Sequence, residues 1–286
     1  MMTNQKNVAR AAGIAGCAIV MTAMNWAVRA ENTAAPLRIC AAENEAPYSL
    51  KDESGFENRI ANIVAKAMGR DPVFVWSSRP AIYLVQDYLD KNLCDVLMGV
   101  DQDDPRVLTT RPYYRSGYVF VSRQDRNLKI DDWNSPVLGQ LSHIAVGLGS
   151  PAEAMLRATG LYENNMNYIY SLVNFKSPRN QYVRVEPSLM VSQVIQGKAD
   201  LAIAFGAEVA RYVRNSTIPL KMEFVPPDTV PDQNGKTIEF DYSESMAVRK
   251  GEDQLLKALN DAIEASAPQI EALLKEEGVP LRTGKS

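Results

Sequence analysis

Short β-rich runs and stretches with helical spacing alternate along this chain. Apolar residues recur three or four positions apart between Ile60 and Met68, and Gly69 ends the pattern, which is typical of an amphipathic helix. Val73–Trp76 is rich in β-branched and aromatic residues, as expected of a strand. The first half therefore predicts, in order, a strand at 37–41, a helix at 60–68, a strand at 73–76, a helix at 82–89 and strands at 96–100 and 118–121.

The second half of the chain repeats this alternation. Ser150–Glu153 has the pattern of a capping box with proline at the first helical position, so a helix is predicted to start there. Pro268 is expected to separate two helices near the C-terminus. Residues 163–181 are long for a connection and are expected to form an exposed excursion. The remaining predictions are strands at 144–146, 182–185, 201–205, 222–225 and 246–248 and helices around 191–195, 207–214, 255–263 and 270–274.

This order of elements predicts an α/β fold. Strands that alternate with helices pair in parallel, with helices on both faces of the sheet. Two such series in one chain predict two lobes around a cleft, each a mainly parallel sheet flanked by helices. Ligands of such sheets bind beyond the carboxyl ends of the strands, which here are Ala42–Tyr48, Gly99–Arg106 and Gly147–Ser150.

The first thirty residues have the pattern of an export signal. Lys6 and Arg10 precede a long uncharged stretch that ends in small residues around Ala30. We predict that residues 1–30 are a signal peptide cleaved near Ala30 and that the protein works in the periplasm. The alternatives are a membrane anchor, for which the apolar run is short, and lipidation at Cys17, for which the apolar region is too short.

Composition narrows the classes of function. The chain has 286 residues and a net charge of −3, which becomes about −6 once residues 1–30 are removed. A mildly acidic surface argues against nucleic acid and anionic membranes as partners.

His143 is the only histidine, which excludes a His-rich zinc site, and no Walker loop or complete dinucleotide fingerprint is present. We therefore expect no metal site.

The cysteines fit an exported protein. Cys17 lies within the predicted signal peptide, which leaves Cys40 and Cys94 in or beside predicted strands. An even pair in an oxidising compartment predicts a disulfide. The alternative is two separate buried thiols, which pack as small apolar groups.

Four motifs together resemble a known family. They are Leu37–Ala41, Gly55–Glu57, Cys94–Gly99 and the stretch Arg106–Gly117. Their order and spacing resemble the type II periplasmic solute-binding proteins of the amino-acid class over nearly all of residues 36–283. The resemblance implies two α/β lobes joined by a two-strand hinge: lobe 1 is formed by residues 36–122 plus 242–286, and lobe 2, including the hinge strands, by residues 123–241.

The family's ligand-binding positions are only partly kept. Arg106 occupies the position of the arginine that clamps an amino-acid carboxylate, and the loop before it is acidic rather than rich in hydroxyl groups. Acidic side chains there oppose a carboxylate ligand and pair with Arg106. Arg59 stands where a second acid is usual, and Phe205 or Gly206 stands where the family has an ammonium-binding aspartate. We expect half of the amino-acid clamp to be missing.

One branch of the family matches more closely. Long motifs at 55–61, 94–100 and 106–116 resemble the members encoded beside quinoprotein alcohol dehydrogenases. This resemblance implies a periplasmic, non-catalytic accessory that assists assembly or activation of the calcium-dependent, pyrroloquinoline-quinone methanol dehydrogenase. The expected partner is methanol dehydrogenase, and no membrane span, nucleic-acid partner or resident cofactor is expected. The alternative is a receptor for a small anionic ligand, such as a cofactor, its precursor or an amino acid.

Several residues are candidates for contact with a ligand or partner in the cleft. The arginines can form paired hydrogen bonds to a planar carboxylate ligand, and the helix that follows Ser150 offers free N–H groups to an anion. Paired carboxylates among Glu43, Glu45 and Glu57 are the basis of an enzyme alternative, but nothing in the sequence fixes their separation. The aromatic residues Tyr168, Tyr170 and Phe175 of the excursion are a candidate partner site. The cleft candidates are Glu43, Tyr48, Glu57, Arg59, Asp101, Arg106, Arg111, Tyr113, Tyr114 and Ser150.

Overall fold

The computed structural model describes residues 35–173, 184–227, 231–232 and 234–283. The predicted signal peptide, residues 1–30, lies outside the described residues. Within the described ranges, no helix combines the length and the apolar character that crossing a lipid bilayer requires.

The strands of the described residues form one large sheet and one small one. The large sheet consists of β1 (Leu37–Ala42), β4 (Pro72–Ser77), β5 (Val96–Asp101), β6 (Leu108–Thr109), β7 (Tyr114–Arg123), β8 (Ile144–Val146), β9 (Leu201–Phe205), β10 (Leu220–Phe224) and β11 (Asp241–Val248). Its order is β4-β1-β5-β11-β7-β9-β8, with β10 paired to β7 and β6 to β11. The small sheet pairs β2 (Asn44–Glu45) with β3 (Ser49–Leu50).

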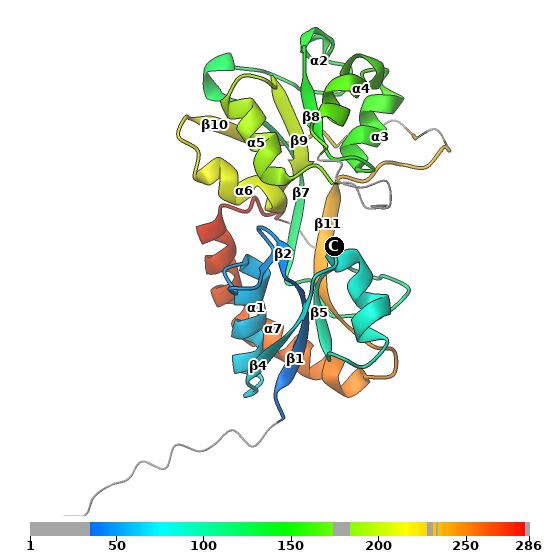
Figure 1. The fold of residues 1–286 in the computed structure, drawn as a ribbon, viewed down its shortest axis with the longest axis vertical. Helices are drawn as coiled ribbons and strands as arrows, with labels where there is room; N and C mark the ends of the chain where they lie inside the picture. Colours follow the sequence, from blue (N-terminus) through cyan, green and yellow to red (C-terminus); the bar gives the residue numbers. More distant parts are fainter. Residues whose placement is uncertain (1–34, 174–183, 228–230, 233, 284–286) are drawn as a thin grey trace, which may run out of the picture. The chain divides into compact units, whose positions relative to one another are not determined.

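Helices cover both ends of the large sheet (Figure 1). They are α1 (Phe56–Ala67), α2 (Pro136–Gln140), α3 (Pro151–Ala158), α4 (Tyr162–Ser171), α5 (Pro187–Ile195), α6 (Gly206–Arg214) and α7 (Asp253–Glu277), with short helical turns η1 (Ala81–Tyr83), η2 (Val85–Leu89) and η3 (Gln124–Arg126). The pairs β1–β4, β1–β5 and β8–β9 are parallel, and β7, β10 and β11 add antiparallel pairs. The predicted α/β fold with two groups of strands and helices is thereby confirmed.

Two long strands link the two groups of elements. The first half of β7 pairs with β11, and its second half, Tyr118–Val121, pairs with β9. The first half of β11 pairs with β7, and its continuation pairs with β5. Figure 1 shows both strands running from one group into the other. The lobe boundaries at 122/123 and 241/242 remain a prediction.

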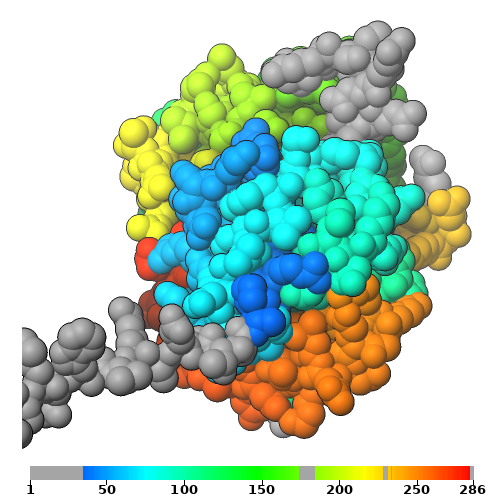
Figure 2. All heavy atoms as spheres, turned by 60° about the horizontal axis from the view of Figure 1, so that its bottom comes forward, coloured from blue at the N-terminus to red at the C-terminus, as the bar shows by residue number. Residues whose placement is uncertain are grey.

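The end of the chain differs from its prediction. Pro268 does not divide two helices but lies inside the single helix α7, which Figure 2 shows in orange against the surface of the earlier residues. Apolar side chains on both sides of the proline, including Leu259, Ile263, Ile270 and Leu274, are fully or nearly fully buried. Burial of one continuous face outweighs the roughly 3 kcal/mol that an interior proline costs a helix.

Three other predicted segments also differ. The region expected as an exposed excursion begins with the helix α4, and residues 174–183 lie outside the described residues. Arg184 and Val185, expected to end a strand, are not in a strand. The helix expected at 82–89 is reduced to the turns η1 and η2. The turns η1 and η2 bury Val85 and Leu89 but leave Ile82 exposed.

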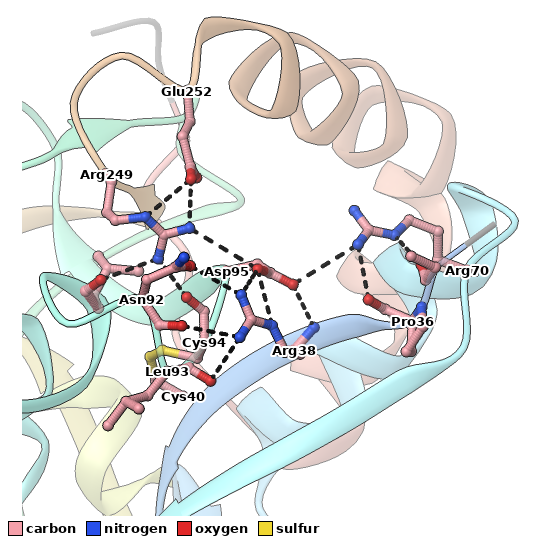
Figure 3. Close-up of polar contacts among 12 residues, drawn as sticks. Pro36, Arg38, Cys40, Arg70, Asn92, Leu93, Cys94, Asp95, Arg249 and Glu252 are labelled. Carbon is pink, nitrogen blue, oxygen red and sulfur yellow. Dashed lines mark hydrogen bonds and ion pairs between the residues drawn. A yellow bond between two sulfur atoms is a disulfide. The ribbon is translucent and has the colours of Figure 1, made fainter.

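A disulfide and an ionic cluster hold the start of β5 against β1. Cys40 and Cys94 are bonded, with a Cα–Cα distance of 5.5 Å, which confirms the predicted disulfide. Beside it, Asp95 accepts hydrogen bonds from the backbone N–H of Arg38 at 2.9 Å and from its guanidinium, and Arg249 approaches within 3.9 Å (Figure 3). Burial alone raises the pKa of Asp95, but the bonds from Arg38 outweigh it and the pKa is lowered.

A buried carboxylate joins three helices. Glu277, the last residue of α7, is 5% exposed. It accepts hydrogen bonds from Arg211 of α6 at 2.7 and 3.0 Å and from Arg59 of α1 at 3.0 Å. Its neighbour Glu276 is exposed and, among the described residues, accepts bonds only from Arg59. The cluster therefore ties α1 and α7 of one group to α6 of the other.

The substitution Glu277→Gln is expected to lower the free energy of unfolding by about 3 kcal/mol, because it leaves the guanidinium of Arg211 half-buried without its counter-charge. The matched control Glu276→Gln is expected to cost less than about 1 kcal/mol, as for an exposed ion pair. Urea denaturation of both variants measures the difference. Equal losses in the two variants would contradict this assignment.

Candidate functional site

A cavity of about 620 Å³ lies where the carboxyl ends of several strands meet. Its walls include Gly99–Asp101 from the end of β5, Leu148–Pro151 after β8, Phe205 at the end of β9 and Glu244 of β11. Residues from both groups of elements therefore line the same space, beyond the ends of the parallel strands, where α/β sheets place their ligands.

Glu57 enters the cavity from the first turn of α1. The backbone N–H of Glu57 donates to the carbonyl of Tyr48 at 3.0 Å, which fixes the start of the helix on the preceding loop. The hydroxyl of Tyr113 donates to Glu57 Oε1 at 2.8 Å and accepts from the N–H of Gly99 at 2.9 Å. Gly99 has φ +64°, and a Cβ there would lie 2.7 Å from Glu57 Oε1. A glycine is therefore required for the carboxylate to approach this strand.

Glu244 faces the same cavity from β11. Its side chain is 9% exposed, and among the described residues it has no hydrogen bond or ion pair. Burial raises its pKa to about 8, and the charges of Glu57 and Asp101 add to the effect. Burial likewise raises the pKa of Glu57 to about 7, although the hydrogen bond from Tyr113 opposes the shift. Two neighbouring carboxylates thus hold protons near neutral pH.

The cavity as a whole is acidic. Among the described residues that line it, Arg106 is the one basic side chain, and the acidic ones are Glu45, Glu57, Asp101, Asp104, Glu208 and Glu244. Burial raises the pKa of Glu208, and burial with the charge of Asp104 raises that of Asp101. Glu45 accepts hydrogen bonds from Arg184 at 3.0 Å and from the N–H of Ala81 at 2.7 Å. This arrangement favours a positively charged occupant.

Arg106 is already occupied by a neighbour. Its Nε donates to both carboxylate oxygens of Asp104, at 3.0 and 3.1 Å, and a second guanidinium nitrogen donates to Oδ2 at 2.6 Å. This pairing is the main cause that raises the pKa of Arg106 and lowers that of Asp104. Two of the three guanidinium nitrogens of Arg106 are therefore engaged within the chain, as the sequence predicted.

Three further candidates form ion pairs away from the cavity. Glu43 pairs with Lys51 at 2.8 Å, and Arg111 pairs with Glu264 at 2.6 Å. Arg59 belongs to the cluster with Glu276 and Glu277. None of these candidates is among the residues that line the cavity. Their charges are used to hold elements of the fold together.

The remaining candidates lie in or directly behind the wall. Tyr48 and Ser150 line the cavity, whereas Tyr113 and Tyr114 are buried behind it. Ser150 caps α3 by accepting from the N–H of Glu153 at 3.2 Å. Glu153 Oε2 also accepts from the N–H of Gly149, so this helix start already has an internal carboxylate.

Sequence reasoning missed an aromatic cluster on the wall. The rings of Tyr118, Phe205 and Tyr242 line the cavity, with ring centroids 5.9 to 6.2 Å apart. Tyr118 and Phe205 are direct partners in the β7–β9 pairing. One residue in the sequence could have indicated this cluster. It is Phe205, which stands at or beside the position of the family's ammonium-binding aspartate. Among the described residues, no group of three or more His, Cys, Asp or Glu side chains is arranged to hold a metal ion.

The buried acids predict a pH-dependent stability. Glu244 keeps its proton in the folded chain up to about pH 8, whereas the unfolded chain releases it near the ordinary value of 4.5. The folded state therefore holds more protons, and the free energy of unfolding falls as pH rises between these values. In the variant Glu244→Gln, we expect the decrease in the free energy of unfolding between these pH values to be smaller by on the order of 3 kcal/mol. Urea denaturation at about pH 5 and pH 8.5 measures it.

The exposed residue Glu271 of α7 supplies the control for that experiment. Glu271→Gln is expected to keep the pH dependence of the unmodified protein, because it leaves the buried acids Glu57 and Glu244 in place. A Glu244→Gln variant whose stability falls as steeply as that of the control would overturn the assignment of the buried proton to Glu244.

Comparison with known proteins agrees with this architecture. The chain is 53% identical over 252 residues to protein MoxJ of Methylorubrum extorquens, across 88% of this chain and 83% of that protein. It is 46% identical over 245 residues to MoxJ of Paracoccus denitrificans, across 86% and 88% of the two chains. The crystal structure of MxaJ from Methlophaga aminisulfidivorans MPT is similar with a TM-score of 0.81 and 49% identity, covering 86% of this chain and 100% of that one.

These similarities confirm the resemblance that the sequence motifs indicated. The profile of the bacterial extracellular solute-binding proteins, family 3, matches residues 37–272, which is most of the chain. The chain therefore belongs to the bacterial extracellular solute-binding proteins of family 3.

Proposed function

We propose that this protein is a periplasmic accessory of methanol oxidation, which binds methanol dehydrogenase and assists its assembly or activation. The similarity to MoxJ and MxaJ over most of the chain supports the pathway. The pairing of Arg106 with Asp104 in an acidic cavity carries the proposal, because it takes the place of the family's carboxylate clamp. A scaffold that keeps its frame without that clamp suits a partner other than an amino acid.

The charge of the cavity disfavours the alternative of an anionic ligand. An anion would have to displace Asp104 from Arg106 and approach Glu57 and Glu244, which carry more negative charge as pH rises. The repulsion from Glu57 and Glu244 increases with pH, whereas the pairing of Arg106 with Asp104 persists throughout. A cofactor or precursor that bears carboxylates is therefore a poor match for this space.

The carboxylates considered for catalysis do not act together. Glu43 pairs with Lys51, whereas Glu45 is held by Arg184, so neither is free to serve with Glu57 as an acid and base pair. We therefore propose a binding role without turnover. Residues 1–30 direct the chain to the periplasm in this proposal, which is the compartment of the disulfide between Cys40 and Cys94.

We expect the purified protein to form a complex with methanol dehydrogenase from the same organism. At about 20 mM salt the acidic chain is steered onto its partner, and at about 500 mM salt the association rate falls several-fold. Biolayer interferometry measures both rates. An amino-acid-binding member of the same family serves as the protein control.

The variant Arg106→Ala distinguishes binding of methanol dehydrogenase from the alternative function, a receptor for a small anionic ligand. It is expected to bind the dehydrogenase as the unmodified protein does, because Arg106 is committed to Asp104. Reconstitution of the dehydrogenase with pyrroloquinoline quinone and calcium, with and without the protein, then tests assistance. The absence of any complex at both salt concentrations would contradict the proposal.

A further inference from the structure

Two independent features of the cavity point to the same class of ligand. The first is the cluster of aromatic rings formed by Tyr118, Phe205 and Tyr242, called here the ring cluster. These rings come from β7, β9 and β11, so the pairing of the large sheet brings them together. Aromatic rings attract cations that lie within about 6 Å of their centroids, and groups of such rings hold alkylammonium ions in proteins.

The second feature is a buried carboxylate without a partner. Glu244 lines the cavity at 9% exposure, and no arginine or lysine pairs with it among the described residues. An ionised carboxylate buried to this degree requires a counter-charge. The charge of Glu57 raises the pKa of Glu244 further, which increases the need of Glu244 for a counter-charge. The missing counter-charge must come from outside the described residues or from a proton.

We propose that this cavity binds a small organic cation, an alkylammonium group seated between the ring cluster and the carboxylate of Glu244. The volume of about 620 Å³ accepts a cation of several carbon atoms. The cation carries no carboxylate, because Arg106 is held by Asp104. This site goes beyond the proposed role with methanol dehydrogenase and does not depend on it.

Binding of such a cation competes with protons. At low pH Glu57 and Glu244 are protonated and offer no counter-charge, whereas above about pH 8 both are ionised. The hydroxyl groups near Glu244 keep their protons over this range because burial raises their pKa values. The titratable groups that face Glu244 are Glu57 from α1, Asp101 from β5, Glu208 from α6, and Tyr48, Tyr113, Tyr114, Tyr118 and Tyr242.

Isothermal titration calorimetry with matched charged and uncharged probes tests the proposal. Choline is compared with its neutral isostere 3,3-dimethylbutanol, and butylammonium is compared with butanol. We expect at least one cation to bind about tenfold more tightly at pH 8.5 than at pH 6, and at least about tenfold more tightly than its neutral counterpart. The measurement uses the purified protein alone, so its outcome is separate from that of the dehydrogenase experiment.

Three variants locate the site. Glu244→Gln and Tyr242→Leu are each expected to weaken binding of the preferred cation about tenfold, and Glu271→Gln, far from the cavity, is expected to leave it unchanged. Far-ultraviolet circular dichroism checks that each variant is folded. Since butanol and 3,3-dimethylbutanol fill the same space as the two cations without charge, equal binding of the alcohols and the cations would overturn the proposal. The proposal would also be overturned if neither cation gave heat at about 50 mM. A heat from calcium chloride without one from either organic cation would have the same consequence.

Discussion

The site of this protein depends on the burial of neighbouring carboxylates in a cavity whose arginine is already paired. Removing a carboxylate from water is costly unless a proton or a counter-charge accompanies it. The charge of Glu57 increases the need of Glu244 for one of these, whereas Arg106 is committed to Asp104. The cavity therefore has the opposite charge preference from a site that grips a carboxylate, and this difference determines which partners fit.

The fold explains why these residues meet. Glu57 is carried by the first turn of α1, and Gly99 lets its carboxylate approach β5 without a clash. Glu244 lies on β11, one of the two strands that connect the groups of elements, and the other such strand carries Tyr118. A change in the pairing of β7 and β11 would separate the ring cluster from the carboxylates. Strands β7 and β11 therefore build the fold that is shared with the solute-binding family. They also carry the side chains that give the cavity its altered chemistry.

The sequence predicted the frame better than the interior of the site. Periodicity placed the main strands and α1, and the two cysteines left after the predicted signal peptide predicted the disulfide. The pairing of Arg106 was also predictable, because Asp104 is only two residues away. Glu244 was not, since it looks like an ordinary acid in a strand and only the pairing of β11 with β5 turns it inward. Pro268 misled the prediction because a local rule says nothing of the long buried face on both sides of it.

The charge of the cavity leads to one direct measurement. Alanine, glutamine and glutamate share the α-carboxylate that a family member with a working clamp recognises. Calorimetric titration of the purified protein with each of them at about pH 8.5 is expected to give no saturable heat up to about 10 mM, because Glu57 and Glu244 are then ionised and repel the carboxylate, and Asp104 holds Arg106. Tight binding of any of the three, abolished by Arg106→Ala, would show a working amino-acid receptor and contradict the account.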